Sequence, residues 1–263
     1  MYNITRDWWC EQRMWRSAGA ETGSLAEPVS MVTGIVIVAF ALVPNSDAGA
    51  ELPLLFLFYK ACLVLLGIGT AVFHGMEYKD SLVAHVNLNL FDWAPIVLTI
   101  TVLLGIYLQS AVRMLKNYVA VLVYMGVIVW AGFLLLAMDT STYQALEAWG
   151  WGTLLNGLLL GPPLLILAVF TWLKFGWRAW VLWFLLAISL AAWLVNYYAC
   201  QYWFVLSVLH AAYHVVMAYA LLLAGCLGIT IGDEWEIDKS SAWVRVRYVK
   251  GYKQLKGIPF FIN

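Results

Sequence analysis

Seven long runs of apolar residues, separated by short polar stretches, constrain this chain more than any other feature of its sequence. Most runs are close to the roughly 20 residues that an α-helix needs to cross the apolar core of a bilayer. They predict seven transmembrane helices packed into one bundle, an all-α fold. The runs cover residues 29–45, 53–74, 90–109, 117–138, 152–173, 178–198 and 203–231.

The composition agrees with this interpretation. Hydrophobic residues make up 63% of the chain and charged residues only 11%, and a water-soluble domain could not bury so much apolar surface. The 15 tryptophans are typical of the aromatic belts at membrane surfaces. The formal net charge is +0 and the first half has no long basic block, so nucleic acid is not an expected partner. We expect a multi-pass integral membrane protein.

The chain divides into three parts: an N-terminal segment of residues 1–28, the helical domain of residues 29–231, and a tail of residues 232–263. The first segment is polar and of mixed charge, unlike the start of a cleavable signal peptide. The tail is basic with interleaved aromatic residues, which favours contact with anionic lipid over binding of a partner protein.

The positions of lysine and arginine predict the orientation. With seven alternating helices, four basic residues lie on the side of the N-terminus and ten on the other side, six of them in the tail. Because cytoplasmic loops are enriched in lysine and arginine, the N-terminus is expected outside and the C-terminus in the cytoplasm or the matching compartment of an organelle. Retinal proteins also have seven helices, but the last run has no lysine for a Schiff base.

Ionisable residues inside the apolar runs are rare, and such residues are usually functional. His210 and His214 are four residues apart in the last run, on one face of a helix. His74 ends the second run, and Asp92 stands at the start of the third. Since the helices alternate in direction, these four residues are expected at a similar depth near the outer side.

Three imidazoles and a carboxylate at one depth are typical of a catalytic zinc site. Zinc in such sites has three protein ligands and a water, whose pKa it lowers to about 7. Asp92 could take a proton from that water, and the hydroxyl of Thr70, one turn before His74, could donate to an oxyanion. A lone histidine more often bonds to another helix, and a histidine pair can also bind haem or copper. His85, in the polar stretch 75–89, is an alternative ligand.

Five segments together resemble one known family. They are "WWCEQR", "LAEPVSMVTGIVIVAFAL", "GIGTAVFH", "DWAPI" and "HAAYHVVMA", which follow one another between residues 8 and 218. In this order they are similar to the motifs of the alkaline ceramidases, part of a superfamily of seven-helix membrane hydrolases that includes the adiponectin receptors. The resemblance implies an intramembrane zinc-dependent amidohydrolase. Such an enzyme cleaves the amide bond of ceramide-like N-acyl sphingoid lipids to a sphingoid base and a fatty acid.

The resemblance also implies roles for individual residues. It implies zinc bound by His74, His210 and His214, with Asp92 as the acid and base that activates water. Thr70 stands where the family has serine, so a hydroxyl is kept and a methyl group is added.

A second metal is implied near the N-terminus. The family binds calcium there, and the backbone carbonyl of Trp9 with the side chains of Glu11 and Glu27 matches its ligand positions. Arg13 stands where eukaryotic members have asparagine, and a guanidinium cannot ligate calcium. Arg13 could instead replace the cation by pairing with Glu11 or Glu27.

The cysteines fall into two pairs. The resemblance implies a disulfide between Cys10 and Cys200, and both residues are expected outside, where disulfides persist. Cys62 and Cys226 lie within apolar runs and are expected to be packing residues.

The stretch between His74 and Asp92 is longer than in the family, so residues 75–89 are expected to form a lid, a protein-binding surface or a remodelled site. An alternative function follows: a catalytically retired homologue that serves as a structural or lipid-binding subunit of a membrane complex, with residues 75–89 and the tail as contacts. The retained histidines and Asp92 argue against it. A receptor of the adiponectin type would have its N-terminus inside, against the charge distribution.

Three further expectations concern helix packing. Gly67, with Gly69, should let a neighbouring helix approach closely. Asn196, like Asn156, should form hydrogen bonds between helices. Lys60 should either reach the membrane surface or pair within the bundle.

Overall fold

The computed structural model describes six stretches of helix and a small sheet. The described residues are 27–44, 52–76, 82–111, 122, 126, 164–199, 208–231, 235–237 and 246–248. The helices are α2 (Pro28–Leu42), α3 (Leu54–Gly75), α4 (Leu82–Ala111), a helix at Leu164–Phe175, α8 (Trp180–Ala199) and α9 (Val208–Thr230), with a short 3₁₀ turn, η3 (Gly176–Ala179), before α8. The predicted all-α class is confirmed for this part of the chain.

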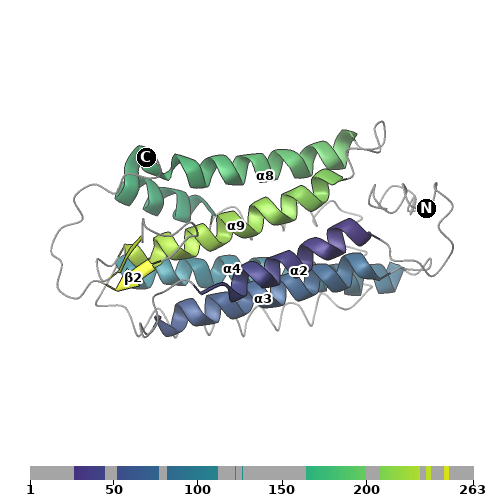
Figure 1. Cartoon of the computed structure of the whole chain (residues 1–263), viewed down its shortest axis with the longest axis horizontal. Coiled ribbons are helices and arrows are strands. Elements are labelled where there is room, and N and C mark those ends of the chain that lie inside the picture. Colours follow the sequence, from purple (N-terminus) through teal and green to yellow (C-terminus); the bar gives the residue numbers. More distant parts are fainter. Residues whose placement is uncertain are drawn as a thin grey trace.

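The helices lie side by side along the long axis of the molecule (Figure 1). α9 is central, because it packs against α2, α3, α4 and α8. α2 packs on α3, and α3 packs on α4.

The predicted apolar runs agree with the helices to within a few residues, with one exception. α4 begins at Leu82 rather than at residue 90, so Asp92 lies inside the helix and not at its start. A hydropathy pattern detects only the apolar part of a helix, and α4 continues N-terminally into the polar sequence "LVAHVNLN". Residues 82–89 are therefore helical. Only residues 122 and 126 of the run 117–138 are described, and residues 152–163 lie outside the described part of the chain.

The tail contains a feature that the sequence analysis did not predict. β1 (Trp235–Ile237) and β2 (Val246–Tyr248) form a two-stranded antiparallel sheet, with Glu236 opposite Arg247. Val246 is fully buried, and β1 packs against α9. The alternation of apolar and charged residues in "VRVRY" is the pattern of a half-buried strand.

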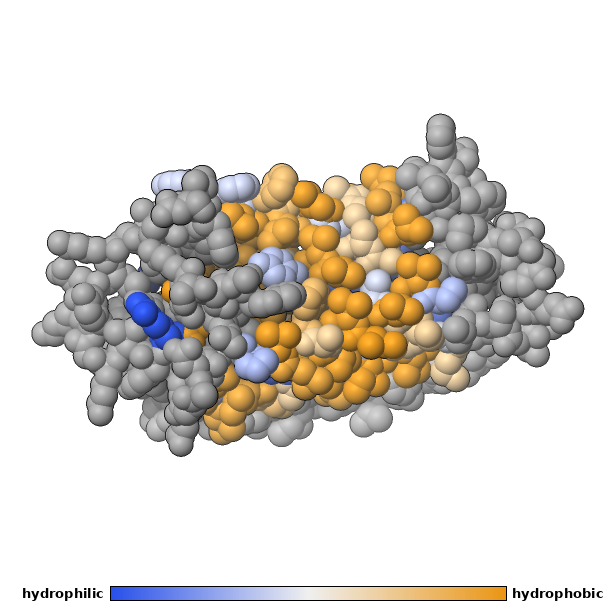
Figure 2. Space-filling view, in the orientation of Figure 1, coloured by the Kyte–Doolittle hydropathy of each residue, from blue (hydrophilic) through white to orange (hydrophobic). Residues whose placement is uncertain are grey.

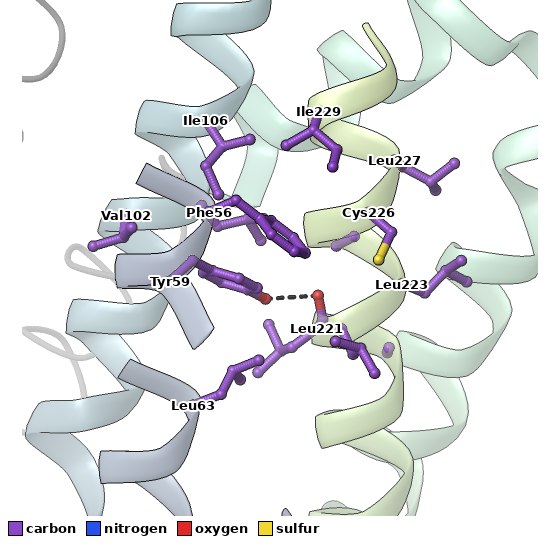
Figure 3. Packing of buried hydrophobic residues seen from close by; sticks show 14 of the residues in the cluster. Phe56, Tyr59, Leu63, Val102, Ile106, Leu221, Leu223, Cys226, Leu227 and Ile229 are labelled. Atoms are coloured by element: carbon purple, nitrogen blue, oxygen red, sulfur yellow. Dashed lines mark hydrogen bonds between the residues drawn. The ribbon is translucent and has the colours of Figure 1, made fainter. Parts of the chain in front are cut away.

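Two tyrosines in the core between α3, α4 and α9 donate hydrogen bonds to the backbone of α9, and Figure 3 shows one of them, Tyr59. Tyr59 of α3 donates to the carbonyl oxygen of Leu221 at 2.6 Å, and Tyr107 of α4 donates to that of Ala224 at 3.0 Å. Each ring lies against a glycine of α9. A Cβ at Gly225 would lie 2.5 Å from Tyr59, and one at Gly228 would lie 2.7 Å from Tyr107.

α2 and α3 cross at a pair of glycines. A Cβ at Gly34 would lie 2.5 Å from the carbonyl oxygen of Gly67, and a Cβ at Gly67 would lie 2.6 Å from that of Gly34. The two backbones touch because neither position has a side chain, as expected for Gly67. Near the other end of α3, Lys60 donates to the carbonyl oxygen of Val43 at 2.8 Å. Lys60 thus pairs within the bundle, at the C-terminal end of α2.

Large apolar side chains are exposed on the described helices, and a smaller set of polar side chains is buried in a core that is mostly apolar. α3 and α9 are long and apolar enough to cross a membrane, at 22 and 23 residues. Ile35, Leu65 and Phe184 are 58%, 51% and 53% exposed, and hydrophobic residues cover most of the described middle of the molecule in Figure 2. The polar side chains buried inside include Glu27, Thr70, His74, Asn196, His210 and His214. Exposed apolar side chains on several helices, together with buried charged and polar side chains, are unusual for a water-soluble protein.

Candidate metal centre

Three histidines converge in the interior of the bundle. The ring nitrogens that His74, His210 and His214 offer all lie within 4.8 Å of one another, and all three residues are buried. His74 ends α3, while His210 and His214 occupy the first two turns of α9. The sequence expectation that these three histidines lie together is confirmed, and the group could hold a metal ion.

The rings form a compact triangle. The centroid of His74 lies 5.0 Å from the centroids of both His210 and His214, and the last two are 4.6 Å apart. The rings meet edge to face, with interplanar angles of 62° to 80°. This arrangement turns the nitrogens at the ring edges toward a shared point rather than stacking the rings.

Glu27 supports His74 from α2. One oxygen of its carboxylate, Oε2, is hydrogen-bonded to Nδ1 of His74, and its backbone N–H donates to the carbonyl oxygen of His74 at 2.9 Å. Glu27 is only 2% exposed. A buried carboxylate is costly without a partner, and here the imidazole supplies one.

The glycine crossing of α2 and α3 sets this contact. Glu27 precedes Gly34 by seven residues, and His74 follows Gly67 by seven residues. The two helices are antiparallel, so both residues lie about 10 Å from the crossing in the same direction. The equal spacing places the carboxylate beside the imidazole.

The protonation of the pair leaves a lone pair on His74. An ionised Glu27 only accepts hydrogen bonds, so Nδ1 of His74 would carry the proton of this contact, and Nε2 of a neutral ring would then have a lone pair. That Nε2 lies 3.1 Å from Nε2 of His214. A proton held between the two nitrogens, or a cation bound by both lone pairs, satisfies this contact. The third imidazole of His210 beside them favours the cation.

Asn196 of α8 contacts the third histidine. Its side-chain nitrogen Nδ2 lies 3.4 Å from Nδ1 of His210, and both residues are buried. The expected interhelical hydrogen bond of Asn196 is confirmed. Since Nδ1 of His210 faces Asn196, its Nε2 is the nitrogen directed to the cluster, as it is in His74 and His214.

The donor set therefore fits a divalent cation. Three imidazole nitrogens are the ligand set of catalytic zinc sites, in which a fourth position stays open. Metal-binding histidines usually form a hydrogen bond from their second ring nitrogen to a carboxylate, a carbonyl or a water. In His74 the partner of that nitrogen is the carboxylate of Glu27. The carboxylate also offsets part of the charge that a dication would bring into the apolar interior.

Of the other residues predicted to belong to the site, only some have side chains that the structure describes. Thr70 is fully buried one turn before His74 on α3. Asp92 belongs to α4, but its side chain and that of His85 lie outside the described part of the structure, as do Trp9, Glu11, Cys10 and Cys200. The calcium site and the disulfide stay predictions. Cys62 and Cys226 are free and buried in the core, as expected.

The place of Glu27 at the histidine cluster was not predicted. The resemblance implied calcium binding by Glu27, which stays a prediction, and the structure adds a hydrogen bond between its Oε2 and Nδ1 of His74. The signal available in the sequence was the equal spacing from Glu27 to Gly34 and from Gly67 to His74, which becomes readable only when the two glycines are known to cross.

Comparisons with known proteins add no relative: no protein-family model matches this chain, and no curated protein matches it. The resemblance to the alkaline ceramidases therefore rests on the short motifs alone and stays a prediction.

Proposed function

We propose that this chain is a multi-pass membrane hydrolase that binds zinc through His74, His210 and His214 and cleaves the amide bond of ceramide-like N-acyl sphingoid lipids. One observation carries the proposal: a buried cluster of three histidines, with a carboxylate on the second nitrogen of His74, inside a bundle whose exterior is apolar.

The apolar exterior supports the multi-pass part of the proposal. Leucine, isoleucine and phenylalanine side chains face outward on α2, α3 and α8, and these helices pack side by side around α9 with α4. In water such a surface would drive aggregation, whereas acyl chains solvate it. We propose seven membrane-spanning helices, with the N-terminus outside and the C-terminus in the cytoplasm.

The choice of zinc rests on the donor set. Three neutral imidazoles without thiolates, in a closed apolar interior, suit a borderline cation that accepts tetrahedral coordination. Bound zinc would supply a Lewis acid for the amide carbonyl and an acidic water. The histidines hold the metal, while Glu27 fixes the orientation of His74 and keeps its Nε2 deprotonated.

Two further residues complete the proposed chemistry. In the proposal, Asp92 of α4 accepts the proton of the attacking water and delivers it to the nitrogen of the departing sphingoid amine. The buried hydroxyl of Thr70, one turn from His74, donates to the oxygen that becomes negative in the transition state. The amide bond breaks, and the products are a fatty acid and a long-chain base.

The location of the site supports a lipid substrate. The histidines are enclosed by helices whose outer faces are apolar, so a substrate with long acyl chains can approach from the surrounding lipid without leaving an apolar phase. The motifs "GIGTAVFH", "DWAPI" and "HAAYHVVMA" narrow that class to N-acyl sphingoid lipids by resemblance.

Metal content and lipid turnover test the proposal together. Full-length protein is purified in detergent beside His210→Ala, and zinc is measured by elemental mass spectrometry. We expect about one zinc per chain in the wild type and almost none in the variant, because two histidines rarely retain a catalytic zinc.

Turnover is then followed as fatty acid released from ceramides of several chain lengths, with a known ceramidase in parallel. Release by the wild type and not by His210→Ala is expected. Zinc without any release would overturn the amidohydrolase proposal and favour a structural or lipid-binding subunit. A wild type without zinc would overturn the metal centre itself.

A further inference from the structure

Asn196 reaches the histidine cluster from α8, and the proposed chemistry gives it no role. The residue is 2% exposed and its amide lies 3.4 Å from Nδ1 of His210. A carboxamide inside a bundle with an apolar exterior is unfavourable unless its polar atoms are bonded.

The sequence of α8 directs Asn196 to α9. Leu182, Ser189 and Asn196 recur every seven residues and are buried at 3%, 0% and 2%, while Leu190 and Leu194 face outward. The hydroxyl of Ser189 donates to the carbonyl oxygen of Tyr213 at 3.4 Å. The buried face of α8 is thus polar at two successive positions along α9, and only Asn196 touches a histidine side chain.

One polar atom of the Asn196 amide is not used in the contact with His210. Within the described residues, Oδ1 of Asn196 has no hydrogen-bond partner, although it is buried. A half-turn about the last side-chain bond exchanges Oδ1 with Nδ2, so the amide can present either atom to His210. If His210 binds a metal through Nε2, its Nδ1 carries a proton and requires an acceptor.

We propose that Asn196 is a positioning residue of the metal centre: its Oδ1 accepts the hydrogen bond of Nδ1–H of His210 and so fixes the tautomer and the plane of that ligand. The inference rests on the metal site of the proposed function and deepens it. Glu27 is then the charged support of one ligand and Asn196 the neutral support of another.

The neutral support has a consequence for charge. A dication with three neutral imidazoles and the Glu27 carboxylate carries one net positive charge. A second carboxylate in place of Asn196 would cancel that charge and weaken the polarisation of a bound carbonyl. An amide therefore orients His210 while leaving the metal electrophilic.

The test measures zinc affinity, because a positioning role must appear there independently of turnover. Metal-free full-length protein in detergent is titrated with Zn²⁺ against a chromophoric chelator. Asn196→Leu removes the acceptor at similar size, and Asn196→Asp keeps an acceptor and removes the donor. Ser189→Ala is the matched control, since it lies on the same buried face of α8 and touches no histidine side chain.

We expect Asn196→Leu to weaken zinc binding about 10- to 100-fold, as for other supports of metal-binding histidines. Asn196→Asp should bind zinc as tightly as the wild type or more tightly, and Ser189→Ala should match the wild type. The visible spectrum of Co²⁺-loaded protein should change in Asn196→Leu and stay unchanged in Ser189→Ala.

Two results would overturn the inference: unchanged affinity in Asn196→Leu, or a loss in Asn196→Asp as large as in Asn196→Leu, which would mean that the amide acts as a donor. If Asn196→Leu does not fold, the zinc affinity of Asn196→Asp is compared with that of Ser189→Ala. Affinity retained in Asn196→Asp supports the inference, and affinity lost in Asn196→Asp alone overturns it. A wild type that binds no zinc overturns the proposed function as well, so the two failures are distinguishable.

Discussion

At the scale of single residues, the most informative contact is that between Glu27 and His74. The buried carboxylate of Glu27 and the buried imidazole of His74 share one hydrogen bond, at the edge of a three-histidine cluster. The carboxylate fixes which nitrogen of His74 is protonated and makes the other a better ligand. The charge of Glu27 therefore serves the cluster rather than the stability of α2 alone.

Replacement of Glu27 tests this role. We expect Glu27→Gln to weaken zinc binding about 10- to 100-fold, because the amide orients the ring but no longer raises the basicity of its Nε2. Thr33→Ala is the control, since Thr33 is buried on α2 and its hydroxyl donates within α2, to the carbonyl oxygen of Ser30. The measurement is the chelator competition described above.

The same titration separates zinc support from calcium binding, the role predicted for Glu27 from the sequence. It is run in buffer prepared without calcium, and again with added Ca²⁺. A deficit of Glu27→Gln in both buffers supports the contact with His74. A deficit that appears only with Ca²⁺ would assign Glu27 to calcium instead.

Much of this site was predictable at the residue scale, and the reason is the cost of polarity in an apolar chain. The sequence identified His74, His210 and His214 because an imidazole in an apolar run is unfavourable without a bonding partner. The spacing of His210 and His214 then places both on one face of the helix. The contacts of Glu27 and Asn196 could not be found, because both depend on which helices are neighbours and at what register.

At the scale of elements, register is set by small residues where helices cross. Gly34 and Gly67 let the backbones of α2 and α3 touch, and the Glu27 and His74 pair lies seven residues beyond on each helix. On α9, Gly225 and Gly228 receive the rings of Tyr59 and Tyr107. The histidines are therefore positioned by contacts that lie well away from them.

A methyl group at the crossing should disturb both packing and metal binding. In Gly67→Ala the new Cβ would lie 2.6 Å from the backbone oxygen of Gly34, which cannot move without shifting α2. We expect a loss of about 1–3 kcal/mol of stability, typical of overpacking. Zinc affinity should fall as well, because the shift separates Glu27 from His74. Thermal unfolding in detergent and the zinc titration measure the two effects.

Gly75→Ala on the same helix is the matched control. Its Cβ would meet only the flexible side chain of Met31, with the sulfur at 2.9 Å. A methionine side chain can move aside at little cost, so this variant should stay close to the wild type. Equal losses in Gly67→Ala and Gly75→Ala would show that the crossing has no special part in the site.

The elements themselves were largely predictable from hydropathy, and the misses have physical causes. α4 extends N-terminally beyond its apolar part because a helix, once started, can continue through His85, Asn87 and Asn89. The sheet of β1 and β2 was missed because its strands have three residues each, too few for periodicity to stand out in a basic tail.

At the scale of the whole molecule, the distribution of polar and apolar side chains supports the proposed membrane location. Polar side chains are buried in the interior, and apolar side chains such as Leu54 and Leu173, at 72% and 76% exposed, face outward. In that location the hydrophobic effect would offer no gain from burying residues that a lipid phase already solvates. Hydrogen bonds and close contacts at glycines then hold the helices together, as the tyrosine and glycine pairs on α9 do.

The number of membrane crossings has a direct consequence for the two ends of the chain. Seven crossings, or any odd number, place the termini on opposite sides, and an even number places them on the same side. The excess of lysine and arginine in the tail favours the cytoplasm for the C-terminal end. We therefore expect residue 24 to be outside and residue 240 to be in the cytoplasm.

Cysteine labelling tests this topology. Ser24→Cys and Ser240→Cys are made separately in a chain with Cys10→Ser and Cys200→Ser, in which the two remaining cysteines, Cys62 and Cys226, are buried in the core. A membrane-impermeant maleimide should label Ser24→Cys in intact cells and Ser240→Cys only after permeabilisation. The reverse pattern would place the N-terminus inside, as in a receptor of the adiponectin type. Labelling of both variants before permeabilisation would contradict seven crossings, because the termini would then share one side.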